Sequence, residues 1–229
     1  MSKLNWKTYA FEFLSIFVAV ISAFALTNWD DKRRDRHTEV KILTEIRNGL
    51  EKDIKDVQLN IAGHKAGIKA CQFVRNMANG QAVSKDSFAY HYFSLTRDFI
   101  SIQNSSGYES LKSNGLGTIH NDSLRLKIID IYEYDFRNMA KLEEDYKEMQ
   151  YHTSFFRPIN DILSPNFDFN ESGQIQINVP LDLTPTDKQL LLSYLWKIEV
   201  NRNFVQRFYG DIESKIEQVI GFIEEEIQS

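Results

Sequence analysis

An apolar stretch near the N-terminus is the strongest constraint on this chain. Residues 9–29 read YAFEFLSIFVAVISAFALTNW, with one acidic residue and no basic one. About 20 helical residues are needed to cross the ~30 Å hydrocarbon core of a bilayer. Trp6 and Tyr9 at one end and Trp29 at the other match the aromatic belts of spanning helices. The sequence therefore predicts a transmembrane helix over residues 9–29, preceded by a short tail of residues 1–8.

The chain changes character abruptly after Trp29. Residues 30–36, DDKRRDR, are all charged, and we expect Arg33 and Arg34 to act as interfacial anchors at the headgroups. Two other interpretations remain open: a buried core helix, and a cleaved signal peptide with residues 23–25 (AFA) as its cleavage site. The length of the apolar region and the basic residues directly after it favour a retained span.

One face of the predicted span carries small residues. Ser15, Ala19 and Ala23 recur every fourth residue, a pattern that lets two membrane helices approach closely. Glu12 lies near the same face, one turn earlier. A carboxylate in a span is a candidate for ion traffic or an interhelical hydrogen bond. Its simplest interpretation is structural, because Glu12 is close enough to the interface to reach headgroups or water. We predict membrane-helix association through these four residues.

Composition limits what the remainder can be. The chain has 229 residues, of which 42% are hydrophobic and 26% charged, so residues 30–229 are expected to form one folded domain. Only four prolines and ten glycines favour long helices over a turn-rich β architecture. The net charge of -5 argues against a general nucleic-acid binder, and the single cysteine excludes an intramolecular disulfide. We predict a mainly α fold in which the transmembrane helix continues into an elongated antiparallel helical bundle.

Helical periodicity begins at Val40. Two columns of residues spaced seven apart resemble the a and d positions of a coiled coil. They are Val40, Arg47, Ile54, Ile61 and Ile68, and Leu43, Leu50, Val57, His64 and Cys71. This seam can pack inside the same chain, which is the commoner case, or against another protomer. Asn79-Gly80 is a good stop signal for the helix.

Further helices are predicted along the rest of the chain. Ser84 is expected to cap a helix whose stripe runs from Phe88 to Phe99, and a short helix is expected over residues 108–112. A long helix is expected over residues 121–151, with Leu142, Tyr146 and Met149 on its buried face, and Arg157-Pro158 is expected to end or restart it. Alternation over residues 174–179 predicts at most a short strand or an extended loop. Thr184 or Thr186 is expected to cap a last helix ending near Ile227. Its buried stripe is Val205, Tyr209, Ile212, Ile216, Val219 and Ile223.

No catalytic, cofactor or metal signature is present in the sequence. The five histidines lack a second histidine or a cysteine at metal-ligand spacing. No phosphate-binding loop, dinucleotide fingerprint or nucleophile elbow is found. The sequence therefore predicts a protein that is not an enzyme, with no cofactor and no metal, and leaves any small-molecule ligand unknown.

Two stretches resemble a known family. One is the exit from the predicted span through Asn28-Trp29 into a charged helix. The other is GYESLKSNGLGTIHNDSLRLKIIDIYE, residues 107–133, which has the form Tyr-x-x-Leu-x-x-x-Gly and then Ile-x-Asn-x-x-Leu-Arg. Both resemble an uncharacterised family, a domain of unknown function, of small single-pass membrane proteins common in Bacteroidota. The positions concerned are Tyr108, Leu111, Gly115, Ile119, Asn121, Leu124 and Arg125. The resemblance implies the helical layout and brings no activity.

The motif also has a physical interpretation, in which Gly115 ends one helix, Ile119 packs down and Asn121 caps the next. Tyr108 and Leu111 would then pack on the helix that begins there. A binding surface is the alternative.

Topology and function are open from the sequence. Lysines and arginines are more numerous after the span than before it, which favours a cytoplasmic domain, whereas the resemblance implies an inner-membrane protein with a periplasmic one, which we adopt. We expect the lipid bilayer and a second copy or another membrane protein as partners. The leading hypothesis is a membrane-anchored protein that oligomerises, scaffolds or docks a partner at the cell envelope. Alternatives are an accessory of an ion-driven complex that uses Glu12 and a single-pass envelope sensor.

Overall fold

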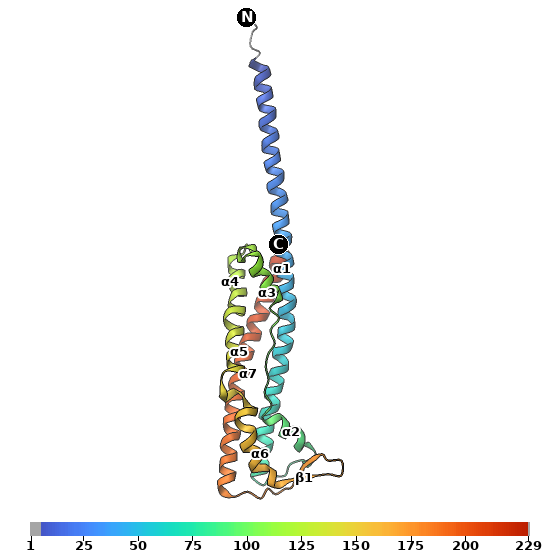
Figure 1. The fold of residues 1–229 in the computed structure, drawn as a ribbon, viewed down its shortest axis with the longest axis vertical. Helices are drawn as coiled ribbons and strands as arrows, with labels where there is room; N and C mark the ends of the chain where they lie inside the picture. Colours follow the sequence, from blue (N-terminus) through green and yellow to red (C-terminus); the bar gives the residue numbers. More distant parts are fainter. Residues whose placement is uncertain (1–5, 229) are drawn as a thin grey trace.

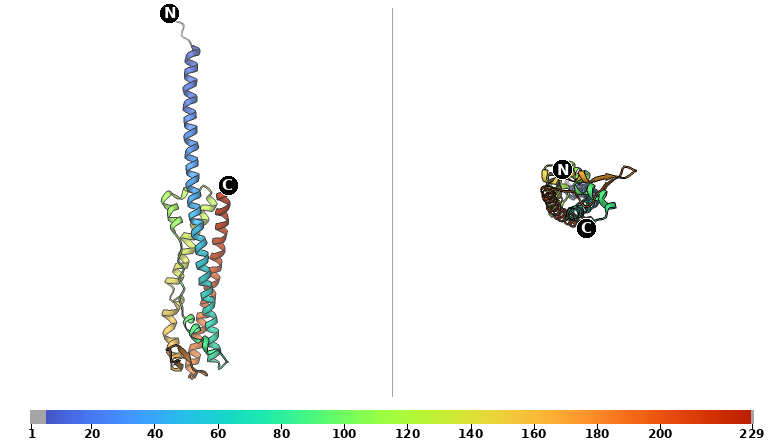
Figure 2. Two further views of the ribbon diagram at one scale, coloured as in Figure 1. Left: turned by 90° about the vertical axis from the view of Figure 1, so that its right-hand side faces the viewer. Right: turned by 90° about the horizontal axis from the view of Figure 1, so that it is seen from below.

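The computed structural model describes residues 6–228, and it consists of one very long helix joined to a helical bundle (Figure 1). Helix α1 spans Trp6–Ala78, and helix α7 spans Pro185–Gln228 and returns antiparallel to its second half. The elements between them stack along this pair, as two perpendicular views show (Figure 2). The predicted mainly α fold, with a bundle continuing from the N-terminal helix, is confirmed.

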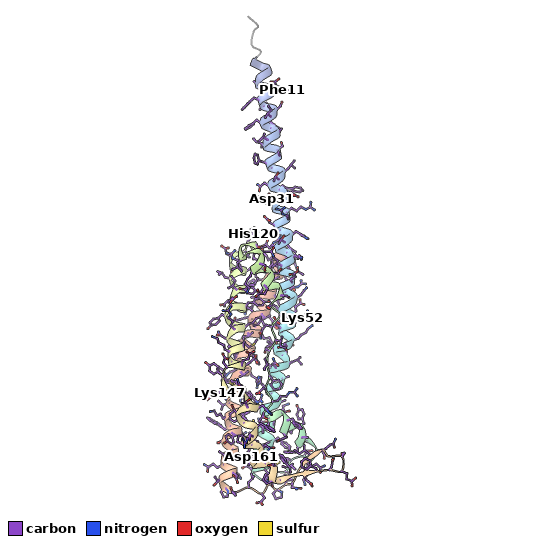
Figure 3. The ribbon with its side chains drawn as sticks, in the orientation of Figure 1. Phe11, Asp31, Lys52, His120, Lys147 and Asp161 are labelled. Carbon is purple, nitrogen blue, oxygen red and sulfur yellow. The ribbon has the colours of Figure 1, made fainter. Side chains whose placement is uncertain are left out.

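Helix α1 has two halves with different surroundings. Its 73 residues correspond to about 110 Å at 1.5 Å per residue. The N-terminal half projects alone from the bundle, and side chains point outwards all round it (Figure 3). The most apolar stretch of this half is not buried against any described part of the chain. The helix is long and apolar enough to cross a membrane. The second half enters the bundle and ends at Asn79-Gly80, where Gly80 has a φ of +73°.

The end of the bundle far from the N-terminus holds small elements. A 3-10 turn over Lys85–Ser87 leads into α2 (Phe88–Leu95). Ser84 makes no side-chain cap, and α2 ends four residues before Phe99, so that part of the prediction is wrong. Strands β1 (Phe167–Phe169) and β2 (Ile175–Ile177) form an antiparallel hairpin, which confirms the short strand expected there.

The middle of the chain is more broken than predicted. Helix α3 spans Ser106–Asn114, and a 3-10 turn over Leu116–Thr118 follows. The expected long helix is a series of segments: α4 (Asp122–Asp130), a π segment (Ile131–Asp135), α5 (Phe136–Glu144), a 3-10 turn (Lys147–Met149), a second π segment (His152–Phe156), α6 (Arg157–Leu163) and a 3-10 turn (Ser164–Asn166).

One detail of that predicted helix needs correction, because the break at residues 145–150 leaves Tyr146 60% exposed instead of buried. Of the two expectations for Arg157-Pro158, the restart is confirmed: α6 begins at Arg157, and Pro158 occupies its first turn, where its missing N–H costs nothing. The last helix follows the prediction closely. Thr184 Oγ1 accepts a 3.1 Å bond from Asp187 N, and the six predicted stripe residues are buried.

The seam of α1 packs inside the same chain, mainly against α7. The predicted column that starts at Leu43 is buried throughout, but the column that starts at Val40 is only partly buried. The true second column lies one residue earlier and recurs every seven residues: Glu39, Ile46, Asp53, Asn60, Gly67 and Val74, all buried. The register was missed because three of these six residues are polar and one is glycine. That column positions the candidate site.

Candidate functional site

A buried arginine occupies the middle of the bundle. Arg202 of α7 is fully buried and points at α1 and at the connection between α2 and α3. Its Nη2 donates to the carbonyl oxygens of Leu95 (3.0 Å) and Arg97 (2.9 Å), and its Nη1 lies 3.0 Å from Nδ1 of His64. The guanidinium also lies over the ring of Tyr151, 4.0 Å from the centroid. Arg202 thus joins three segments without pairing to a carboxylate.

Two glycines of α1 make room for this arrangement. A Cβ on Gly67 would lie 2.4 Å from Nε of Arg202, and a Cβ on Gly63 would lie 2.2 Å from the ring of Phe99. Real Cβ atoms do not approach other atoms that closely. The buried arginine therefore packs directly against the backbone of α1 at Gly67, and the Phe99 ring does so at Gly63.

Burial keeps His64 neutral. Its pKa is lowered to about 3, first by burial and then by the charge of Arg202. Since Nη1 of Arg202 can only donate, Nδ1 of His64 accepts and Nε2 carries the proton. That Nε2 is buried with no hydrogen-bond partner among the described residues. The centroids of the Phe99 and Tyr209 rings lie 5.2 and 5.5 Å from the centroid of the His64 ring. Burial lowers the pKa of Arg202 as well.

Residues 96–105, here called the strap, form an extended, non-helical connection that runs along α1 between α2 and α3 (Figure 1). The strap belongs to no helix or sheet, so its backbone N–H groups need other acceptors. Side-chain carboxylates supply them. Asp53 accepts from the N–H of Asn104 (2.8 Å), Asp56 from that of Ile102 (3.1 Å), and Glu143 of α5 from that of Ser101 (2.9 Å). Three acidic side chains thus fix the register of the strap.

One aromatic hydroxyl and one amide complete this set of polar groups inside the bundle. The set, here called the polar layer, comprises His64, Arg202, Asp53, Asp56, Asn60, Ser101, Glu143 and Tyr209. Tyr209 donates to Glu143, and Asn60 donates to Oγ of Ser101 at 2.7 Å. Burial raises the pKa of Asp53 and of Glu143. The layer separates two apolar clusters of the bundle, one at the end nearer the projecting half of α1 and one at the far end.

The polar layer has a structural role, because its polar side chains are occupied by one another and by the backbone. Its histidine is neutral and directed at a guanidinium, and Glu143 is occupied by Tyr209 and Ser101. Cys71, one turn beyond Gly67, is buried, and burial raises the pKa of its thiol to about 12, which leaves it a thiol at neutral pH. Within residues 6–228, no group of three potential metal ligands comes together.

The neutral His64 predicts a pH dependence of stability. The unfolded chain binds a proton at His64 near pH 6.5, whereas the native chain resists it down to about pH 3. The stability contributed by neutral His64 is present above pH 6.5 and falls by about 1.4 kcal/mol per pH unit below it. We expect His64→Gln, which keeps an acceptor for Arg202 but cannot protonate, to reduce that slope between pH 6.5 and 4. Urea unfolding of the full chain in detergent at several pH values measures it.

Asp53 and Glu143 act in the opposite direction, because their raised pKa values make the native state bind more protons as pH falls. The difference between wild type and His64→Gln removes their contribution, since both proteins contain these carboxylates. Equal slopes in the two proteins would contradict a neutral, buried His64.

The residues that carry the family resemblance form the corner between α3 and α4, at the end of the bundle nearer the projecting half of α1 (Figure 1). Gly115 ends α3 with a φ of +93°, and Asn121 caps α4 by accepting from the N–H of Leu124 at 3.2 Å. Ile119 is fully buried between them, and Arg125 donates to its carbonyl oxygen at 2.8 Å. The physical interpretation of the motif is thereby confirmed for these residues.

Two further motif residues belong to the core beneath that corner. Tyr108 and Leu111 are buried in the cluster that also contains Leu124. Tyr108 stacks on Tyr132, with ring centroids 4.5 Å apart, and donates to Glu133 at 3.1 Å. This parallel stacking was not anticipated.

Another buried carboxylate ties this corner to α1. Glu39 is 2% exposed and accepts from the backbone N–H of His120 at 2.8 Å and from Arg36 at 3.0 Å. Arg36 also donates to the carbonyl oxygen of Glu226, and the amide of Asn121 reaches the Glu226 carboxylate at 2.7 Å. The start of the bundle part of α1, the α3–α4 corner and the end of α7 therefore meet at one level (Figure 3).

The span residues remain separate from these sites. Glu12, Ser15, Ala19 and Ala23 are all exposed, and Ser15 donates to the carbonyl oxygen of Phe11. Glu12 makes no hydrogen bond or ion pair with the described part of the chain. Their role in helix association stays a prediction.

The interfacial anchors lie where the span meets the bundle. Arg33 lies over the exposed ring of Trp29, 5.8 Å from its centroid, and Arg34 pairs with Asp31 at 3.0 Å. The side chains of Trp6 and Tyr9, and residues 1–5 of the predicted tail, lie outside what the structure describes.

The polar layer was missed by sequence reasoning, although one signal was available. Extending the confirmed α7 stripe backwards at the same spacing reaches Arg202, then Ile198, Leu195 and Leu191, all buried. A charged residue inside an apolar stripe marks a buried polar site. The strap residues carried no comparable signal, because their partners are distant in sequence.

No family model, curated protein or solved structure matches this chain. The family resemblance stated from the sequence therefore stays a prediction.

Proposed function

We propose that the chain is a non-enzymatic, membrane-anchored protein that oligomerises, scaffolds or docks a protein partner at the cell envelope. The observation that carries this proposal is the continuity of α1, which runs unbroken from the exposed apolar half into the bundle seam. A helix without a break transmits position rigidly, so it holds the bundle at a fixed height and orientation over the bilayer. The polar layer supports the same proposal because it locks the bundle.

Assembly size in membranes tests the proposal. The full chain, solubilised in mild detergent, is expected to run as an assembly larger than one chain in native electrophoresis. Ala19→Leu adds bulk on the small-residue face and is expected to reduce that assembly if the span contributes to it. Ile21→Phe adds bulk on nearly the opposite face and is the matched control. A single-chain mass for the wild-type protein would contradict the proposal.

The proposed location is the bacterial inner membrane, with the bundle in the periplasm. Asn79 is exposed at the far end of α1, whereas Cys71 is buried with a raised thiol pKa and should label poorly. In intact cells, a membrane-impermeant maleimide is expected to label Asn79→Cys and to leave the wild-type protein largely unlabelled. Labelling of Asn79→Cys only after the inner membrane is broken would place the bundle in the cytoplasm.

A further inference from the structure

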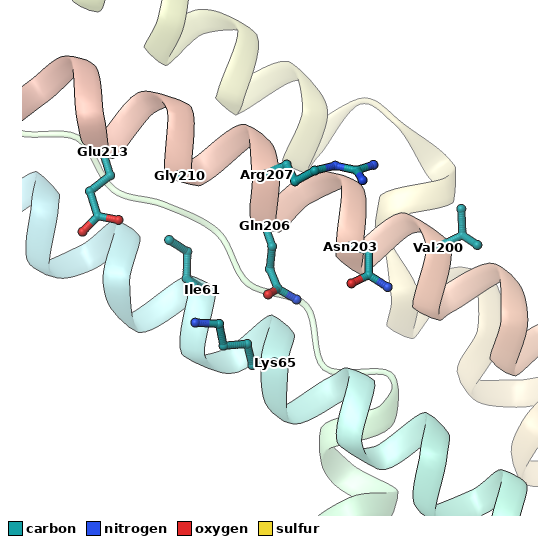
Figure 4. Close-up of a pocket in the computed structure, with 8 residues that line it drawn as sticks. All are labelled: Ile61, Lys65, Val200, Asn203, Gln206, Arg207, Gly210 and Glu213. Carbon is teal, nitrogen blue, oxygen red and sulfur yellow. The ribbon is translucent and has the colours of Figure 1, made fainter.

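A groove runs along the outer side of the α1–α7 pair (Figure 4). Two cross-bridges border it, one between Arg75 and Glu199 and one between Gln58 and Glu213 (2.6 Å). Between them the two helices face each other across a space of about 710 Å³. The stretch of α7 from Glu199 to Glu213 corresponds to about 21 Å, or nearly four helical turns.

The groove exists because of the residues that face each other across it. Ile61 of α1 and Gly210 of α7 both line the groove. Gly210 has no side chain, and a Cβ there would meet nothing within 4 Å, so this part of the groove is open. Asn203 and Gln206 point from α7 towards α1, and Lys65 extends into the gap from α1 (Figure 4). The Nε2 atom of Gln206 is buried without a hydrogen-bond partner among the described residues.

The groove carries more positive than negative charge. Lys65 and Arg207 form no ion pair with any described residue, whereas Glu199 pairs with Arg75 and Glu213 accepts a hydrogen bond from the neutral amide of Gln58, which leaves two unpaired cations against one carboxylate. The whole chain is acidic, with a net charge of -5, so a groove that presents two unpaired cations differs from the average surface.

An exposed apolar stripe borders the groove on α7. Trp196, Val200 and Phe204 recur every fourth residue and are 63%, 46% and 45% exposed. Val200 also lines the groove, so the stripe and the groove form one surface. A concave floor that carries apolar side chains and is flanked by cations matches the helix-in-groove mode of recognition.

We propose that this surface docks an amphipathic helix of a partner protein, three to four turns long, with an apolar stripe flanked by Asp and Glu. Its apolar side chains fill the space over Gly210 and Ile61, and its carboxylates pair with Lys65 and Arg207. The inference rests on the proposed docking function and names the surface and the class of partner.

Site-specific photocrosslinking of the full chain in native membranes tests it. Benzoylphenylalanine replaces Asn203 in the groove or, as a control, the exposed Lys141 of α5. We expect a crosslink from position 203, mapped by mass spectrometry to an acidic amphipathic segment of another protein. Gly210→Trp, which fills the groove from an open position, should reduce the yield at least tenfold. Lys65→Glu with Arg207→Glu should do the same, whereas Lys55→Glu with Lys141→Glu should not.

Other outcomes overturn the inference. A crosslink from position 203 to a second copy, to lipid or to a basic or non-amphipathic segment contradicts it, as does a yield that Gly210→Trp leaves unchanged in a variant with wild-type thermal stability. Native electrophoresis of the same variants separates the two proposals. A large assembly whose crosslink yield is unchanged when the groove is filled contradicts only the groove, whereas a lone chain in every sample contradicts the docking function too.

Discussion

Arg202→Ala is expected to lower the free energy of unfolding by about 4 kcal/mol, because each buried acceptor left without its donor typically costs about 1–3 kcal/mol. The substitution leaves the carbonyl oxygens of Leu95 and Arg97 and Nδ1 of His64 without their donor in a fully buried place. It also removes the contact with Tyr151 and opens a cavity beside Gly67. Urea unfolding of the full chain in detergent, followed by far-ultraviolet circular dichroism, measures the change.

A second substitution makes this expectation specific. In the wild-type protein, Gly67→Ala places a Cβ 2.4 Å from Nε of Arg202 and should destabilise the fold by about 1–3 kcal/mol. In the Arg202→Ala background the same methyl group meets a cavity, and the better helix propensity of alanine should stabilise the fold by up to about 1 kcal/mol. The sign of the Gly67→Ala effect therefore reverses. Additive effects of the two substitutions would contradict the contact.

The sequence predicted most of the helices because their apolar periodicity is local information. The α7 stripe, its Thr184 cap and the stop at Asn79-Gly80 all depend on residues within a few turns of one another. The same holds for Asn121, whose capping bond spans three residues. Such features are encoded where they occur, and single-sequence reasoning finds them.

The candidate site could not be predicted in the same way. The α1 column through Asp53 and Asn60 looks polar, and only the strap, more than 40 residues away in sequence, gives those side chains a buried partner. Phe99 continued the apolar stripe of α2 in the sequence, but the chain leaves the helix at Leu95, whose carbonyl oxygen accepts a hydrogen bond from Arg202. Tertiary hydrogen bonds override local propensity at both places.

Gly107→Ala is expected to destabilise the protein by about 3 kcal/mol, at the upper end of the usual cost of overpacking. A Cβ at this position would lie 2.6 Å from the backbone nitrogen of Ile46, 2.8 Å from the carbonyl carbon of Glu45 and 2.9 Å from Cα of Ile46. A side chain could rotate away, but these are backbone atoms in the interior of α1. Helix α3 would have to move off α1, which disturbs the burial of Tyr108 and Leu111 beneath the corner between α3 and α4.

Gly210→Ala is the matched control, because it makes the same chemical change in a helix where nothing lies within 4 Å of the new methyl group. It should raise stability by up to about 1 kcal/mol through helix propensity alone. The two substitutions are therefore expected to shift the urea midpoint in opposite directions, and hydrogen exchange should show faster opening of α3 only in Gly107→Ala. Shifts of the same sign would mean that α3 does not rest on the backbone of α1. The corner would then lack the contact that fixes its position along α1.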